Sequence, residues 1–260
     1  MKNAATCSCV SDIAKSFSRL VSKGQEESEL YQTSLMSALI DGVYDGDKTI
    51  EQLLQHGDFG LGTFDELDGE LVAFDSEVHQ LREDGSARLA RMDQKTPFAV
   101  VTKFRPTMFG AFGSPLDKSE VQDILDELIG SPNLFCAFRI DGHFERVETR
   151  TVPRQTLPYR PMLQAIERQP VFTFKESPGT LIGFRCPEYV QGINVAGFHV
   201  HYITDDRQGG GHVLDYRLTE GRVEVARISR LRIDLPRTEH FQRATLHSED
   251  LGRAIEAAEG

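Results

Sequence analysis

The stretch GFHVHYITDDRQGGGHVLDY, residues 197–216, holds three of the chain's eight histidines within fourteen residues. Side chains alternate between the two faces of a β-strand, so His199 and His201 point to the same face of the strand predicted here. The segment TDDRQGGG predicts a chain reversal, after which His212 begins the next strand. Because paired strands bring opposite side chains close together, the pattern predicts three imidazoles on one face of a sheet.

Three converging imidazoles indicate a metal site. Zinc binds neutral imidazole nitrogens at about 2.0–2.1 Å, and a site with three protein ligands leaves one position open for chemistry. Imidazole also suits iron, copper and nickel, so the ligand type alone does not select the metal. The alternative is three structural histidines, each hydrogen-bonded within the sheet. The spacing favours the metal site over this alternative.

Outward from this stretch, the chain is rich in strand and hairpin signals. An Asp-Gly pair between two short apolar runs is a strong hairpin signal. The chain carries this signal at Asp68-Gly69, Asp84-Gly85 and Asp141-Gly142. Further strands are predicted over residues 171–176, 180–186, 194–204, 211–221 and 222–236.

Helices are predicted to be few and short. Helical apolar spacing begins at Leu30 and continues through Leu35 and Leu39, although a strand is an alternative near the end of this segment. Three further helices are predicted over residues 49–57, 119–130 and 161–169. This mixture favours an α+β or mixed α/β fold with two strand-rich subdomains, each built on a mixed or antiparallel sheet.

The length of 260 residues suits one large domain or two small ones. We expect a flexible N-terminal tail over residues 1–25, an N-terminal sheet domain over 26–152, and a C-terminal sheet domain over 153–260. The C-terminal domain would carry the three histidines.

The composition excludes several classes of function. The net charge of −11 argues against a nucleic-acid partner. No apolar run approaches the ~18 residues of a membrane-spanning helix, and the N-terminus lacks the apolar region of a signal peptide. The four cysteines, Cys7, Cys9, Cys136 and Cys186, fit a reducing compartment. We therefore expect a cytoplasmic protein without a nucleic-acid or membrane partner.

Four segments together resemble the α-acetolactate decarboxylase family. They are GDFGLGTFDELDGELVAFD (57–75), TRTVPRQTLPYRP (149–161), residues 197–216, and IEAAEG (255–260). The resemblance runs from about Leu30 to the end and leaves the residues before 25 outside. It implies a two-domain α/β fold, often dimeric. It also implies decarboxylation of (S)-2-acetolactate to (R)-acetoin and CO₂, for acetoin and butanediol biosynthesis, with zinc and no organic cofactor.

The resemblance also implies which residues form the site. From the sequence alone Glu70 and Arg150 are ordinary charged residues, and Arg154 competes with Arg150. The C-terminal tail is expected to fold back over the metal, with Glu259 preferred to Glu256 as its site residue. The implied set comprises the zinc ligands His199, His201 and His212, the catalytic residues Glu70, Arg150 and Glu259, and the substrate-binding residues Thr63 and Arg150. Glu70 and the terminal glutamate are the two candidates for the proton donor.

Two other functions would use a similar histidine pattern. A three-histidine zinc hydratase of the carbonic-anhydrase type would need a water nucleophile and no arginine that holds an acid. A non-catalytic, cupin-like metal-binding module would carry a P-x-G-x-x-H segment, and this segment is absent around His212. We expect instead that a small 2-hydroxy-3-oxo acid is the partner of the site.

Overall fold

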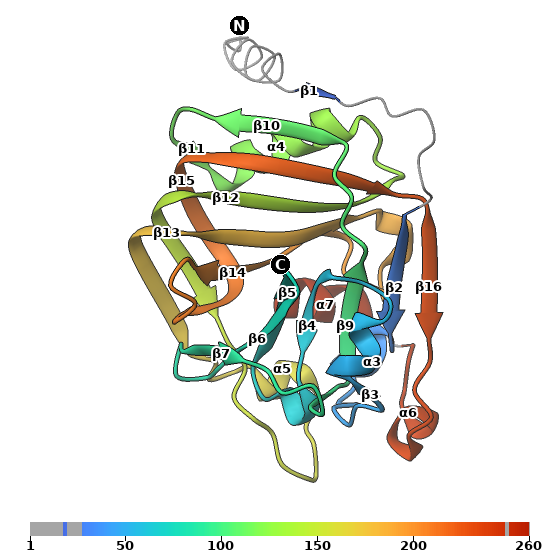
Figure 1. Ribbon diagram of the computed structural model, residues 1–260. Helices are drawn as coiled ribbons and strands as arrows, with labels where there is room; N and C mark the ends of the chain where they lie inside the picture. The colour runs from blue at the N-terminus through green and yellow to red at the C-terminus, as the bar shows by residue number, and fades with distance from the viewer. Residues whose placement is uncertain (1–17, 20–27, 248–249, 260) are drawn as a thin grey trace, which may run out of the picture.

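The computed structural model describes residues 18–19, 28–247 and 250–259, which form two seven-stranded sheets and one two-stranded pair (Figure 1). The expected tail, residues 1–25, lies outside the described residues except for Ser18–Arg19. The two-stranded pair consists of β3 (Lys48–Thr49) and β8 (Lys95–Thr96).

The first sheet is antiparallel and contains three long strands that lie across the upper half of Figure 1. Its path is β1 (Ser18–Arg19), β10 (Met108–Phe112), β15 (Gly210–Ile228), β12 (Phe135–Arg150), β13 (Val171–Cys186) and β14 (Gly197–Thr204). A short strand, β11 (Leu116–Asp117), also pairs with β15. In addition β15 pairs with β14, and this pairing brings the histidine-bearing ends of the two strands together.

The second sheet is mixed, because β16 and β2 run parallel while its other neighbours are antiparallel. Its order is β16 (Arg230–Asp234), β2 (Glu29–Thr33), β9 (Phe98–Thr102), β4 (Phe59–Thr63), β5 (Glu70–Phe74), β6 (Glu77–Leu81) and β7 (Ala87–Leu89). The predicted fold class, strand-rich with mixed or antiparallel sheets and few short helices, is therefore confirmed.

The helices are short, with one exception. They are α2 (Met36–Ile40), α3 (Ile50–Leu54), α4 (Lys118–Ile129), α5 (Met162–Ala165), α6 (Glu239–Arg243) and α7 (Leu251–Glu259), with two 3₁₀ turns, η1 (Asp65–Leu67) and η2 (Glu188–Val190). As predicted, α4 ends at Gly130, whose φ of +72° suits glycine. Thr49 caps α3 as expected, but the helix ends at Leu54, short of Gly57.

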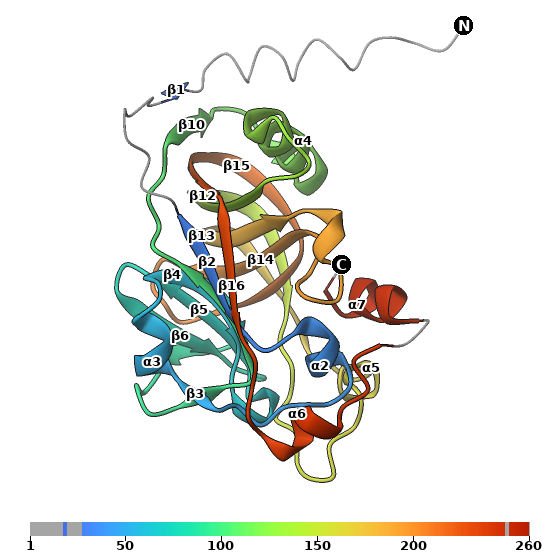
Figure 2. The ribbon, with the colours of Figure 1, turned by 90° about the vertical axis from the view of Figure 1, so that its right-hand side faces the viewer.

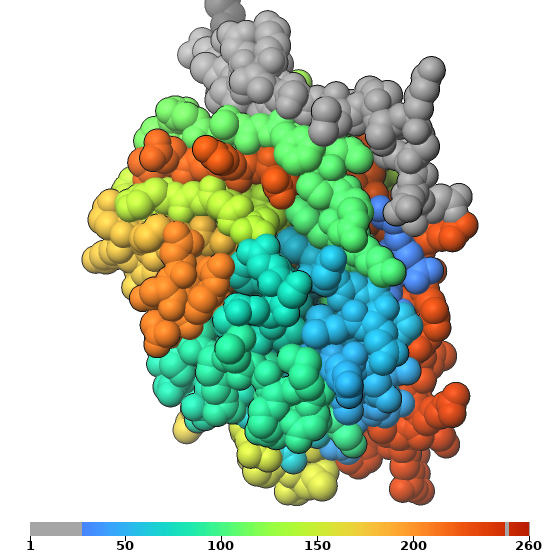
Figure 3. Space-filling view, in the orientation of Figure 1, coloured from blue at the N-terminus to red at the C-terminus, as the bar shows by residue number. Residues whose placement is uncertain are grey.

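The two sheets share a hydrophobic core. In this core Phe59 of β4 lies against Phe184 of β13, with their ring centroids 6.0 Å apart. On the face shown in Figure 3, the strands of the first half lie directly beside the turn between β14 and β15. The backbone of Ala87 donates a hydrogen bond to Gln208 in that turn. The turn that separates His201 from His212 is therefore supported by the second sheet.

The hairpin predicted at Asp141-Gly142 is wrong, although the hairpins at Gly69 and Gly85 are present. Residues 135–150 form the single strand β12, which pairs with β13 on one side and β15 on the other. Pairing on both edges keeps Asp141 and Gly142 extended. Glycine is needed here for a close approach, because a Cβ at Gly142 would lie 2.5 Å from the carbonyl oxygen of Glu220.

The segment from Leu30 also differs from the prediction. Its start is the strand β2 and the helix α2 follows, whereas the apolar spacing predicted a helix first. The reason is tertiary: β2 pairs with β16 on one edge and β9 on the other, while Leu30 and Tyr31 are buried in separate hydrophobic clusters. Pairing on both edges outweighs a helical spacing in so short a segment.

The expected domain boundary after residue 152 does not separate the two sheets. The strand β12 precedes this boundary and pairs with β13 and β15, which follow it. In the opposite direction, β16 from the second half joins β2 at the edge of the second sheet. Both edges of β12 are hydrogen-bonded along their length to strands that follow residue 152. Each sheet therefore contains strands from both halves of the sequence.

Candidate metal centre and active site

The three histidines come together where β14 and β15 pair. His201 lies directly opposite His212 in the register, and His199 shares their face of β14. The ring centroids are 5.1–5.5 Å apart, and one potential ligand nitrogen from each ring lies within 4.8 Å of the others. All three side chains are buried. The predicted convergence of three imidazoles is therefore present in the structure.

The glycine run between these strands permits their close approach. A Cβ at Gly211 would lie 2.6 Å from the carbonyl oxygen of Arg150 on the neighbouring strand β12. Before the run, the carboxylate of Asp206 accepts hydrogen bonds from Thr204 and from the backbone of Gln208, which fixes the turn. This local chemistry explains why TDDRQGGG reverses the chain and sets the register of His212.

The ring nitrogens fit a metal ion. The Nδ1 of His201 donates a hydrogen bond to the carbonyl oxygen of Leu71 at 2.8 Å, so its Nε2 carries the lone pair. Among the described residues, this Nε2, both nitrogens of His199 and the Nδ1 of His212 are buried without a hydrogen-bond partner. An unpartnered buried lone pair is costly, and a cation would satisfy one nitrogen of each ring.

Burial also holds the imidazoles neutral. It lowers the pKa of His201 to about 3, and it lowers the pKa of His199 and of His212 well below the usual value. Neutral imidazole is the form that binds a metal. The donor set and its protonation state therefore both suit a divalent metal.

Arg150 lies at the end of β12, opposite His212 in the register, and its side chain is buried. Its Nη1 donates to Glu70 Oε1 at 3.1 Å, and its Nη2 lies 3.4 Å from Glu259 Oε2. The same Nη2 also donates to the carbonyl oxygen of Ala258. Arg154, the competing candidate, is largely exposed and pairs with Glu66 away from the histidines. Arg150 is thus the arginine that the structure brings to the metal centre.

Glu70 and Glu259 both lie close to the histidines, although they are far apart in the sequence. Glu70 begins β5, just after the Asp68-Gly69 turn, and its Oε2 lies 3.8 Å from His201 Nε2. Glu259 is at the end of α7, and its Oε2 lies 3.3 Å from His199 Nε2 and 3.4 Å from His212 Nδ1. Glu256 is exposed. The C-terminal helix therefore brings Glu259, and not Glu256, to the histidines.

Burial raises the pKa of both carboxyl groups. The pKa of Glu70 is raised to about 8 by burial and by the nearby Glu259, against the opposing effect of Arg150. The pKa of Glu259 is raised by burial to about 7, again opposed by Arg150. Two buried carboxyl groups that share one guanidinium resist full ionisation together.

Thr63 lies opposite Glu70 in the β4–β5 hairpin. Its hydroxyl donates to the carbonyl oxygen of Gly69 at 2.8 Å, which steadies the turn before Glu70. Thr63 also lines a small inner cavity of about 10 Å³ beside the histidines. The walls of this cavity include apolar residues that the sequence analysis missed, because they look like ordinary core residues: Met36, Leu39, Leu67, Phe98, Val152 and Met162.

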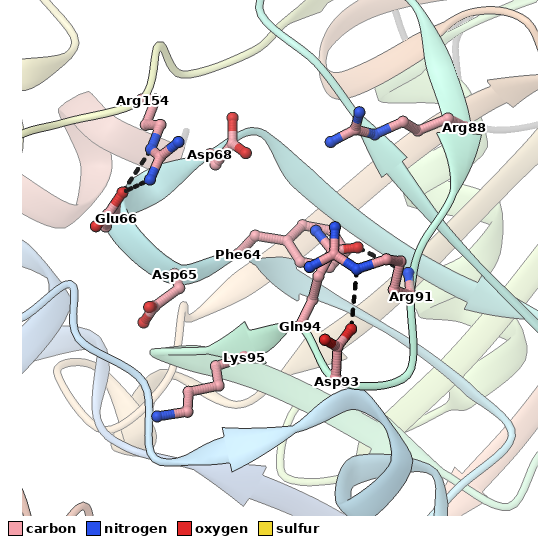
Figure 4. Close-up of a pocket in the computed structure, with 10 residues that line it drawn as sticks. All are labelled: Phe64, Asp65, Glu66, Asp68, Arg88, Arg91, Asp93, Gln94, Lys95 and Arg154. Carbon is pink, nitrogen blue, oxygen red and sulfur yellow. Dashed lines mark hydrogen bonds and ion pairs between the residues drawn. The ribbon is translucent and has the colours of Figure 1, made fainter.

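A second cavity, of about 410 Å³, lies on the outer side of η1 and contains none of the three histidines (Figure 4). Charged side chains line it, and Arg154–Glu66 and Arg91–Asp93 form ion pairs at its edge. It also lacks Glu70, Arg150 and Glu259. This cavity is separate from the metal centre despite its larger volume.

The site combines three neutral imidazoles with an arginine and two carboxyl groups. This combination is typical of metal-dependent enzymes that act on anionic substrates. The family profile described as Alpha-acetolactate decarboxylase matches residues 30–248. An alpha-acetolactate decarboxylase of Raoultella terrigena is 55% identical over 259 residues, covering 100% of both chains. That of Klebsiella aerogenes is 53% identical over 259 residues, covering 100% of this chain and 99% of its own.

A solved structure agrees with these relatives. The crystal structure of alpha-acetolactate decarboxylase from Bacillus subtilis strain 168 superposes with a TM-score of 0.88 at 41% identity, covering 89% of this chain and 99% of that chain. The chain belongs to the alpha-acetolactate decarboxylase family and is an enzyme, a carboxy-lyase. The comparisons do not favour the hydratase and cupin alternatives. The similarity also includes the residues before 25, which the motifs had left outside.

No described helix is long and apolar enough to cross a membrane.

Proposed function

We propose that the chain converts (S)-2-acetolactate to (R)-acetoin and CO₂ with one zinc ion held by His199, His201 and His212. The observation that supports this proposal most directly is the group of buried, unpartnered imidazole nitrogens beside the Arg150 guanidinium. When bound, zinc would supply a Lewis acid for the oxygen that gains negative charge in the reaction.

The protein's own residues supply binding and proton transfer. Loss of CO₂ leaves an electron pair on the former α-carbon, and the adjacent ketone oxygen accepts it to give an enolate. Arg150, with its planar fork of donors, holds the substrate carboxylate and then the developing oxygen charge. Its two carboxylate neighbours hold the guanidinium in place. Thr63 contributes to the wall against which the substrate lies.

A carboxyl group on one face of the enolate would deliver the proton that sets the R configuration. Glu70 and Glu259 are the two candidates, because both lie within 4 Å of a histidine nitrogen and both are bound to Arg150. Glu70 comes from the strand β5 and Glu259 from the helix α7, so the two carboxyl groups reach the site from separate elements. The proton donor would fix the enantiomer, while the other carboxyl group would position Arg150.

Chiral analysis of the product tests this division of roles. The wild-type enzyme should convert racemic acetolactate to acetoin enriched in the R form. Glu70→Gln should retain zinc and lose rate, enantiomeric excess or both, because the amide keeps the shape and loses the acidic proton. An unchanged rate together with unchanged enantiomeric excess would remove Glu70 from the mechanism.

We also propose that the enzyme works as a homodimer in the cytoplasm. The buried Cys136 and Cys186 are free thiols, which suits a reducing compartment. Light scattering coupled to size-exclusion chromatography measures the assembly, and cell fractionation measures the location. A monomeric mass, or recovery outside the cytoplasm, would refute the respective part of this proposal.

A further inference from the structure

A wide groove lies on the side of the molecule where α4 and α7 are both seen in Figure 2. Its volume is about 690 Å³, and its walls come from the start of α4, from η2, from the start of β14 and from α7. Lys118 and Gln122 contribute from α4, and Ile255, Glu256 and Glu259 contribute from α7. The groove is large enough for a small organic acid.

The groove and the inner cavity meet at Glu259, the residue that lines both. The inner cavity of about 10 Å³ holds no more than roughly one water molecule. A substrate that reaches the histidines must therefore enter from a larger space, and the groove shares Glu259, at the end of α7, with the inner cavity.

Lys118 is the one cationic side chain that lines the groove within the described part of the chain; Glu188, Glu256 and Glu259 are carboxylates. Its Nζ donates to the carbonyl oxygen of Leu214 at 2.9 Å. An ammonium group has three donors, so two remain for a ligand. Lys118 is half-buried, and burial lowers its pKa.

No described carboxylate forms an ion pair with Lys118. The nearest acidic influence on it is Asp215, whose Oδ2 already accepts from Arg146 Nη2 at 2.5 Å. A half-buried cation without a described ion-pair partner, in a groove that shares Glu259 with the inner cavity, favours an anionic ligand.

We infer that this groove is the entrance for the substrate, and that Lys118 binds the substrate carboxylate there before Arg150 receives it. The inference rests on the proposed function, because it takes acetolactate as the anion. Lys118 would draw an anion into a groove whose other charges repel it, and Glu259 would stand between the entrance and the metal centre. Lys118 is thus a substrate-binding residue that acts on capture and not on the chemical step.

Steady-state kinetics with acetolactate test this inference. Lys118→Met keeps the length of the side chain and removes the charge, while Lys118→Arg keeps the charge. In Lys118→Met we expect kcat/KM to fall about fivefold to tenfold while kcat changes by less than about twofold, because the lost interaction guides encounter. Raising the salt concentration should lower kcat/KM of the wild type, whereas kcat/KM of Lys118→Met should stay level or rise, because only repelling carboxylates then remain in the groove. The exposed Lys175→Met is the control for the loss of one positive charge and should behave as the wild type.

Three outcomes would overturn the inference. The first is a wild-type kcat/KM in Lys118→Met. The second is an equal fall of kcat in Lys118→Met and Lys118→Arg with loss of bound metal, which would mean that Lys118 only holds β15 through Leu214. The third is a fall of kcat/KM with rising salt that persists in Lys118→Met. Failure of the wild type to form acetoin would instead refute the proposed function, so the two failures are distinguishable.

Discussion

Arg150 connects the parts of the site at the scale of single residues. Its guanidinium bonds Glu70, lies 3.4 Å from Glu259 and reaches the backbone of α7, while its own backbone pairs with His212. One planar group thus joins strands of both sheets and the C-terminal helix. A flexible ammonium cannot make this set of contacts, because it lacks the fixed fork of donors.

Arg150→Lys should therefore lower kcat/KM by roughly one to two orders of magnitude or more, the scale of one lost transition-state donor. Bound metal should persist, because the three imidazoles remain. The measurement is acetoin formation together with metal analysis. Arg154→Lys is the matched control, since Arg154 is exposed and lies outside the site. Near-wild-type turnover in Arg150→Lys would show that another residue holds the substrate.

Glu259 and Glu256 form a natural pair for comparison. Both belong to α7, but Glu259 is buried against two histidines and Glu256 is exposed. Glu259→Gln should lower kcat by about one to two orders of magnitude, since it removes a group that could transfer a proton. Glu256→Gln should leave kcat within about twofold, measured in the same acetoin assay. Equal effects of the two substitutions would contradict the placement of Glu259 in the site.

At the scale of elements, the C-terminal helix is more firmly attached than its sequence suggested. RAIEAAEG is rich in alanine and glutamate, a composition typical of a frayed chain end, but α7 is not such an end. Ala254, Ile255 and Ala258 are buried in the main hydrophobic core, and the helix packs against α2 and α5. The apolar side chains of α7 are buried against α2 and α5, and this packing holds the C-terminal helix beside the histidines.

Ile255→Ala should then reduce the free energy of unfolding by about 2–4 kcal/mol, because it opens a cavity in a buried contact. Urea denaturation of the metal-loaded enzyme measures the change. Ala257→Ser, at an exposed position of the same helix, is the control and should change stability by less than about 0.5 kcal/mol. An unchanged unfolding midpoint in Ile255→Ala would mean that α7 is only loosely attached.

The elements also show how far sequence reasoning extends. Local signals predicted what local chemistry decides: the cap of α3 at Thr49, the end of α4 at Gly130, and the turn at Gly69. The same Asp-Gly signal failed at Asp141, because two neighbouring strands hold β12 extended. Pairing between distant segments is a tertiary property, and it does not follow from a dipeptide.

The site follows the same division between local and distant contacts. The three histidines lie in one hairpin, so their spacing predicted their convergence. Arg150 and Glu259 lie 109 residues apart, and Arg150 and Glu70 lie 80 apart. Only the family resemblance indicated these three residues, because nothing in their local sequence separates them from surface charges. Lys118 had no signal at all, since its relation to the groove depends on the packing of α4 near α7.

At the scale of the whole molecule, the metal centre lies where the two sheets meet. The histidines and Arg150 come from the first sheet, Glu70 comes from the second, and Glu259 comes from α7, which packs against α2 and α5 (Figure 2). The strand β12, before residue 152, pairs with β15 after it, and β16, after residue 152, pairs with β2 before it. These pairings hold the two halves of the chain together. A site assembled in this way needs the entire fold, whereas the three histidines need only one hairpin to come together.

The central claim is that His199, His201 and His212 hold one zinc ion that the decarboxylation requires. The most direct test is to remove metal with a chelator, add zinc back in steps, and measure bound zinc and acetoin formation on the same samples. We expect both to rise together and to level off at about one zinc per chain, with little of either in His212→Ala. Full activity in the metal-free enzyme, or undiminished zinc in His212→Ala, would contradict the claim.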